Sequence, residues 1–157
     1  MIQEDNDVEL HEVKKEQVLI TSHQTINHDI CGEIEKLEVG YVELKLVTTS
    51  EMVADNLGII HGGVIFGAAD YAAMIAVNER NVVLVGADSQ FLSPVKYGDI
   101  VLFKAKVRHK EGRKRNVNVV AYVQDIKVFD GELKTVVTDR HVLKLHLLGD
   151  EEEHFDN

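Results

Sequence analysis

The sequence has one cysteine and no long apolar run, and each scarcity excludes a class of protein. A single thiol, that of Cys31, excludes a disulfide within the chain and fits a reducing cytoplasm. No apolar run reaches the roughly 18–20 residues that span a bilayer, because His61 and Asp70 interrupt the longest one. The acidic residues 1–7 lack the basic and then apolar order of a signal peptide. We therefore expect a cytoplasmic protein with no membrane partner.

Positive charge is also scarce. The chain has 17 Lys and Arg residues against 27 Asp and Glu residues, and its net charge is −10. This balance disfavours binding to a phosphate backbone, so we expect no nucleic-acid partner. Much of the negative charge lies at the two ends, and 157 residues suit one domain. We divide the chain into an acidic arm and lead-in segment at 1–28, a folded domain at 29–148 and an acidic tail at 149–157.

The apolar pattern predicts strands on both sides of one long helix. Strands are predicted near 30–39 and 42–47, a loop over 50–60, a helix over 62–79, and then strands only. Within the later strands, Asp130-Gly131 is a hairpin signal between 128–129 and a closing strand that runs to 148. Residues 13–28 fit either an edge strand or a short helix. The order predicts an α+β domain with an antiparallel sheet wrapped around the helix.

The predicted helix is apolar on every side, which is typical of a buried helix, yet it contains the carboxylate of Asp70. Burying an unpaired carboxylate costs free energy and raises its pKa, so Asp70 is the first candidate for chemistry. The helix begins with Gly62 and Gly63. The N–H groups of a first helical turn have no partner within the helix and lie at the positive end of its dipole. They can stabilise an oxyanion that develops on a substrate carbonyl.

Residues 61–70, with the sequence HGGVIFGAAD, resemble the His-Gly-Gly segment of hotdog-fold acyl-CoA thioesterases of the phenylacetate-pathway and Them2-like type. Those enzymes carry a catalytic Asp or Glu at the same step, nine residues after the histidine, and residues 90–99 resemble the strand and turn that follow. The resemblance covers about residues 30–147. It implies a single hotdog domain and a homodimer, with a dimer of dimers left open. It also implies that Gly63 supplies the oxyanion donor and that Asp70 of the other protomer acts as general base or nucleophile.

Residues 30–38 and the strand after them resemble the ligand domain of the malonyl-CoA-sensing repressor of fatty-acid synthesis, which is also a hotdog protein. That repressor has an asparagine at the position of Asp70 and is not an enzyme. Two functions therefore stay open, an acyl-CoA thioesterase and a non-enzymatic acyl-CoA sensor that acts through a partner protein. A hotdog dehydratase, which needs a histidine with a carboxylate, is a third. No cofactor beyond the CoA of the ligand is expected, and no histidine spacing indicates a metal site.

Three arginines and three other residues are candidates for substrate binding: Asn56, Gly62, Ser89, Arg108, Arg113 and Arg115. The arginines form a basic cluster with Lys110 and Lys114, which either seats the phosphates of CoA or is an exposed hairpin. Ser89 either holds a water or the acyl group, or is an ordinary strand hydroxyl.

His61 and Asp55 also have two interpretations each. His61 either orients the thioester in catalysis or satisfies a loop carbonyl near the start of the helix. The related thioesterases often have an asparagine six residues before the histidine, where this chain has Asp55 followed by Asn56. Asp55 either fails to position water or substrate as that asparagine would, or a loop shift lets Asn56 do so instead. If Asp55 lies near Asp70, the second carboxylate would also perturb the titration of Asp70.

Overall fold

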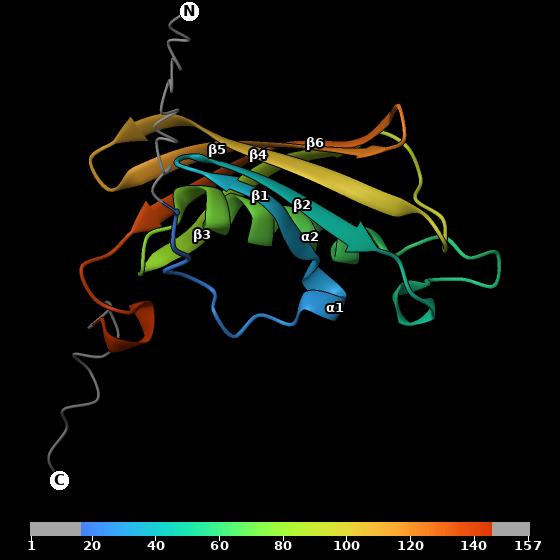
Figure 1. Cartoon of the computed structure of the whole chain (residues 1–157), viewed down its shortest axis with the longest axis horizontal. Coiled ribbons are helices and arrows are strands. Elements are labelled where there is room, and N and C mark those ends of the chain that lie inside the picture. The colour runs from blue at the N-terminus through green and yellow to red at the C-terminus, as the bar shows by residue number, and fades with distance from the viewer. Residues whose placement is uncertain (1–16, 146–157) are drawn as a thin grey trace, which may run out of the picture.

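A six-stranded antiparallel sheet curls around one long helix in the computed structural model, which describes residues 17–145 (Figure 1). Along the chain the elements are α1 (His28–Cys31), β1 (Glu33–Glu38), β2 (Tyr41–Val47), η1 (Ser50–Met52), α2 (Gly62–Val77), β3 (Val82–Phe91), β4 (Ile100–Glu111), β5 (Lys114–Val123), β6 (Ile126–Val137) and η2 (Val142–Lys144). The strand order is β1-β2-β4-β5-β6-β3, and every pair of neighbours is antiparallel. This confirms the predicted α+β hotdog architecture.

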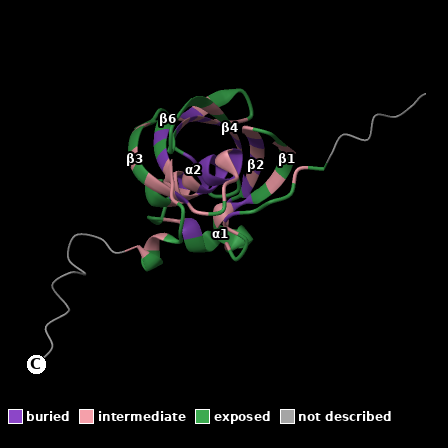
Figure 2. Cartoon of the chain, turned by 90° about the vertical axis from the view of Figure 1, so that its left-hand side faces the viewer, coloured by how far each residue is buried: buried purple, intermediate pink, exposed green. Residues whose placement is uncertain are grey.

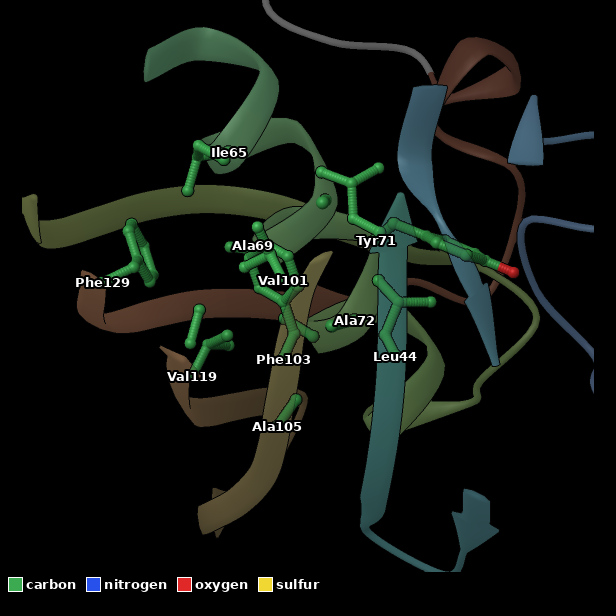
Figure 3. Close-up of a cluster of buried hydrophobic side chains, with 14 of the residues drawn as sticks. Leu44, Ile65, Ala69, Tyr71, Ala72, Val101, Phe103, Ala105, Val119 and Phe129 are labelled. Atoms are coloured by element: carbon green, nitrogen blue, oxygen red, sulfur yellow. The ribbon is translucent and has the colours of Figure 1, made fainter. Parts of the chain in front are cut away.

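The sheet curls around α2 (Figure 2), and the short side chains of this helix allow the close approach. Ala68, Ala69, Ala72 and Ala73 are each 0% exposed. Inward-facing side chains of the sheet cover them, among which Leu44, Phe103 and Phe129 are also 0% exposed (Figure 3). Because side chains alternate across a strand, the residues between these inward positions are left at the outer face of the sheet.

The C-terminal end of α2 fixes the segment that precedes α1. The helix ends at Asn78, which adopts a left-handed conformation with φ +51° and donates its N–H to the carbonyl of Met74 at 2.8 Å. The Asn78 side chain accepts from the N–H of Thr21 at 2.8 Å and donates to the carbonyl of Leu19 at 2.7 Å. Residues 17–27 therefore form neither the edge strand nor the helix expected within 13–28, because their backbone groups bond to a helix end instead.

One predicted hairpin is wrong. β6 runs unbroken through Asp130-Gly131, and the chain reverses earlier, at Gln124-Asp125, where Gln124 has φ +51°. Gly131 is needed for close packing within the strand, since a Cβ atom there would lie 2.9 Å from Cζ of Phe129. The closing strand ends at Val137 and not at 148, while residues 1–16 and 146–157, with both acidic tails, lie outside the described residues.

The two ends of α2 lie at opposite ends of the sheet (Figure 1). Loops 48–60 and 92–99 meet at its N-terminal end, where Ile59 bridges to Lys96 and the N–H of Thr48 bonds to the carbonyl of Asp99 at 3.2 Å. The β4–β5 turn and the segment after β6 lie at its C-terminal end, where the N–H of Val137 bonds to the carbonyl of Arg113 at 2.8 Å.

Candidate functional site

Asp70 lies in the middle of α2 between the buried residues Ala69 and Tyr71. Its carboxylate is partly exposed, but Oδ1 is shielded from solvent and has no hydrogen-bond partner among the described residues. Burial raises the pKa of this carboxyl from 3.8 to about 6, since removal from water disfavours the charged form. Asp70 is thus an ionisable group with an unfilled acceptor, and its pKa lies close to neutral pH.

The start of α2 has free amides. Neither Gly62 nor Gly63 donates its N–H to an acceptor within residues 17–145, and the side chain of His61 does not cap the helix. These amides are available to an oxyanion at the positive end of the helix dipole.

The imidazole of His61 lies over Gly63. A Cβ atom at Gly63 would be 2.9 Å from Nε2 of His61, so the glycine permits this position of the ring. His61 does bond to a loop carbonyl, but through its backbone and not its ring. Its N–H donates to the carbonyl of Met52 at 2.9 Å. The hydrogen bonds of the described residues include none from its exposed ring, which leaves the imidazole available at the helix start.

An apolar cavity of about 280 Å³ adjoins Gly62. The residues that line it come from the loop before α2, the first turns of α2, the end of β3, the segment that follows β3, and β6: Ile59, Ile60, Gly62, Ile65, Phe91, Leu92, Ser93, Pro94, Val95 and Val128. A Cβ atom at Gly62 would stand 3.7 Å from the ring of Phe91. The cavity therefore offers apolar surface directly beside the free amides.

Asp55 organises its own loop. Its Oδ1 accepts from the N–H groups of Leu57 at 3.0 Å, Gly58 at 3.0 Å and Ile59 at 3.2 Å. Burial is the cause of the raised pKa of Asp70, and the charge of Asp55 adds nothing to it. Asn56 is exposed in the same turn. The carboxylate of Asp55 is therefore occupied in holding the loop that leads to His61.

Ser89 is the second buried polar group without a partner. It lies on β3 opposite Gly131 of β6, and its Oγ is shielded from solvent with no hydrogen bond to a described residue. A Cβ atom at Gly131 would come within 3.1 Å of this Oγ, so the glycine leaves room for the hydroxyl. Because buried polar atoms are rarely left without partners, Ser89 Oγ and Asp70 Oδ1 are both marked as positions for a bound molecule.

The basic cluster is separated from the start of α2. Arg113 pairs with Asp139, with 2.6 Å between Nη2 and Oδ2. Arg115 is 8% exposed, and its Nη1 donates to the carbonyls of Gly112 at 2.6 Å and Lys114 at 3.0 Å. Only Arg108 of the three arginines is left exposed without an ion pair among the described residues. Within one protomer the cluster lies at the C-terminal end of α2, away from Gly62 and Gly63.

Cys31 neighbours Asp70, which sequence reasoning did not predict. α1 packs on α2, and burial together with the charge of Asp70 raises the pKa of the Cys31 thiol. A raised pKa keeps this thiol protonated and weakly nucleophilic. On the same side, the ring of Tyr71 packs against His28 and His23, with centroids 6.0 and 6.5 Å apart. Cys31 reaches the site through a contact between residues 39 positions apart in the sequence (70 − 31), and no local motif encodes such a contact.

No group of three or more His, Cys, Asp or Glu side chains within 17–145 is placed to hold a metal ion. Over the same residues, no helix has the length and apolar character to cross a membrane.

Comparison with known proteins places this geometry in a family. The family model described as the Thioesterase superfamily matches residues 57–129, which include both glycines, Asp70 and Ser89. A crystal structure of an uncharacterized protein, PH1136 from Pyrococcus horikoshii, is similar with a TM-score of 0.79 and 40% identity, covering 80% of this chain and 97% of that one.

Two relatives are longer than this chain. The methylthioribose-1-phosphate isomerase of Aquifex aeolicus (strain VF5) is 48% identical over 117 residues, which are 74% of this chain and 26% of that protein. The transcription factor FapR of Thermoanaerobacter sp. (strain X514) is 31% identical over 117 residues, which are 74% of this chain and 58% of that protein. The chain thus corresponds to about a quarter of the first and somewhat over half of the second. Its fold, its matched residues and its likeness to PH1136 together show that the chain belongs to the thioesterase superfamily of hotdog proteins.

Proposed function

We propose that this protein is an acyl-CoA thioesterase that hydrolyses its substrate to a free acid and CoA. The observation that carries the proposal is the carboxyl group of Asp70, whose Oδ1 is shielded from solvent without a partner among the described residues and whose pKa is raised to about 6. A general base works best when its pKa lies near the operating pH, and a carboxylate with this pKa is largely ionised at pH 7. The family supports the same chemistry.

In the proposed reaction, Asp70 removes a proton from a water molecule that attacks the carbonyl carbon of the thioester. The hydroxyl of Ser89 forms a hydrogen bond to this water or to the acyl group. That bond gives the buried Oγ of Ser89 the partner that it otherwise lacks among the described residues. The oxyanion accepts a hydrogen bond from the N–H of Gly63. When the tetrahedral intermediate collapses, the carbon–sulfur bond breaks, the sulfur leaves as the CoA thiolate, and the proton held by Asp70 passes to it. Direct attack by the carboxylate, followed by hydrolysis of the resulting anhydride, is the alternative form of the step.

We propose that the site is shared between two protomers. Gly63 and Asp70 are seven residues apart on one helix, which places them about 10 Å apart along its axis. That distance is too long for one thioester carbonyl to contact both. β3 is an edge strand, and its residues Val85 and Phe91 are 61% and 53% exposed. An unpaired, partly apolar edge of this kind favours pairing with a second copy, which brings Gly63 of one protomer to Asp70 of the other.

The likeness to FapR supports a second candidate function, a non-enzymatic acyl-CoA sensor. A sensor needs the cavity and the free amides but not a base. Asp70 separates the two functions, because a carboxylate contributes to hydrolysis and costs free energy in a binding pocket.

The test is a hydrolysis assay on short, long and aromatic acyl-CoAs, in which the released thiol is measured and binding is followed in parallel by calorimetry. For the enzyme we expect Asp70→Asn to abolish turnover and retain binding. Ser89→Ala should lower kcat about tenfold, because it removes one hydrogen bond, worth about 1 kcal/mol, that positions the water or the acyl group. Asp125→Asn, which removes a carboxylate from the exposed β5–β6 turn, is the matched control and should behave as wild type. Binding of the panel without hydrolysis of any member would establish the sensor instead.

A further inference from the structure

A second cavity, of about 620 Å³, lies at the C-terminal end of α2. Three segments far apart in the sequence line it: residues 21–25, residues 80–83, and His141 with Val142. In Figure 1 these segments meet at one end of the molecule, on the side where β3 begins. We name it the Arg80 cavity. Its volume lies in the range of sites that hold small molecules.

Hydrogen bonds hold the walls of the Arg80 cavity in place. The Thr21 hydroxyl donates to the backbone carbonyl of Asn78 at 2.7 Å, which ties the lead-in segment to the end of α2. The N–H of Thr138 donates to the carbonyl of Asn81 at 3.2 Å, which ties the segment after β6 to the start of β3. The cavity is therefore a product of tertiary structure and not a gap beside a loose loop.

The lining of the Arg80 cavity carries no acidic side chain, although the chain as a whole is strongly acidic. None of the residues that line it is Asp or Glu, while the chain contains 27 of them, and its positive charge is that of Arg80. Burial lowers the pKa of His23, which favours the neutral form of that ring. Arg80 is exposed and forms no ion pair within residues 17–145. Glu79, which precedes Arg80 in the chain, forms no ion pair with it, and Asp139, two residues before His141, is paired with Arg113 at 2.6 Å. An anion in this cavity would therefore meet a guanidinium that is not neutralised.

The donors of the Arg80 cavity fit a phosphate. Nδ1 of His141 accepts from the N–H of Leu143 at 3.1 Å, so a neutral His141 ring carries its proton on Nε2 and has a donor to spare. A guanidinium presents parallel N–H groups that match phosphate oxygens. Val82, Val83 and Val142 provide apolar surface for the remainder of a ligand.

We propose that the Arg80 cavity binds a small molecule through a phosphate group held by Arg80 and His141. This site lies at the end of α2 opposite Gly62 and Gly63, and the proposal does not rest on the thioesterase reaction. A purely structural role for Arg80 is the competing explanation, since a cation just beyond the C-terminus of a helix interacts favourably with its dipole. That role affects stability and gives no reason for selective anion binding.

The experiment is calorimetric titration of the full chain with inorganic pyrophosphate, with acetate as a carboxylate comparison at matched ionic strength. We expect saturable pyrophosphate binding that Arg80→Gln weakens about tenfold or more, which is the usual effect of losing a hydrogen bond to a charged group. His141→Asn keeps an acceptor for the N–H of Leu143 but removes the Nε2 donor, so we expect it to weaken binding severalfold without lowering the melting temperature.

Lys106→Gln is the matched control, because it removes one positive charge from an exposed position on β4 outside the Arg80 cavity. It should leave pyrophosphate binding unchanged, as should Asp70→Asn, which separates this site from the proposed thioesterase site. The proposal is wrong if pyrophosphate does not bind saturably, if acetate binds equally well, or if Lys106→Gln weakens binding as much as Arg80→Gln. If Arg80→Gln does not fold, the His141→Asn result decides.

Discussion

Replacing Asp70 by asparagine should make the protein more stable at neutral pH while it removes the proposed activity. The carboxyl has a pKa of 3.8 in its ordinary state and about 6 in the folded protein, because burial disfavours its charge. At about 1.4 kcal/mol for each tenfold change, this difference sets an upper limit of about 3 kcal/mol. Since part of the Asp70 side chain is exposed and water screens it, we expect Asp70→Asn to increase the free energy of unfolding by about 1–2 kcal/mol at pH 7.5.

The sign of this effect depends on pH. A carboxyl whose pKa is raised on folding binds its proton more tightly in the folded state, so its contribution to stability is complete below pH 3.8. The contribution is lost as the pH rises through about 6. Asparagine does not titrate, and the stability gain from Asp70→Asn should therefore shrink almost to zero at pH 4.

The assay is urea denaturation of both proteins at pH 4 and pH 7.5, at one fixed protomer concentration because a dimer's stability depends on it. Asp125→Asn, in the exposed turn, should stay within about 0.5 kcal/mol of wild type at both values. A loss of stability for Asp70→Asn at pH 7.5, or an equal gain at the two pH values, would refute the claim that a buried charge is held at this position.

Three other predictions follow from the site. If Asp70 is the base, kcat/KM should rise with pH around a midpoint near 6 and level off above it, and a flat profile from pH 5 to 8 would exclude this role. If the site is shared, mixing inactive Asp70→Asn and inactive Gly63→Val protomers should restore about one quarter of wild-type activity. Half of the dimers are then mixed, and each mixed dimer has one intact site out of two. If each site lay within one protomer, mixing would restore no activity. Gly131→Ala, whose Cβ would lie 2.9 Å from Phe129, should destabilise the fold by about 1–3 kcal/mol in urea denaturation, whereas Gly86→Ala, with contacts of 3.7 Å, should have less effect.

The sequence predicts the central helix and most of the sheet because those elements follow local periodicity. Alternation in β2 and the unbroken apolar run of α2 are visible in the letters, and burial then follows. The hairpin expected at Asp130-Gly131 was wrong because this dipeptide has two uses. There the glycine makes room for Phe129 inside a strand, a requirement set by packing between residues and not by the turn chemistry of the pair.

The candidate site is predictable in its parts but not in its arrangement. Asp70 and the two glycines stand out because they are costly or unusual within an apolar helix. The sequence does not show that the side chains of Asp55 and Arg115 are occupied by hydrogen bonds to the backbone of their own turns. Those backbone groups come within reach only when the turns are folded. The same holds for Cys31, which reaches Asp70 through the packing of α1 on α2.

The packing that builds the core also prepares the carboxylate. Alanines on α2 allow the sheet to approach until residues such as Ala69 and Ala72 are completely buried. An acid on that helix then loses much of its water, and no hydrogen bond from residues 17–145 to Oδ1 offsets the loss. Asp70 itself stays partly exposed, and it neighbours Cys31 of α1, which packs on the same helix. The sheet and α1 together therefore leave the one acid of α2 with a shielded Oδ1 and a raised pKa, so the packing that stabilises the helix also sets the chemistry of its carboxyl group.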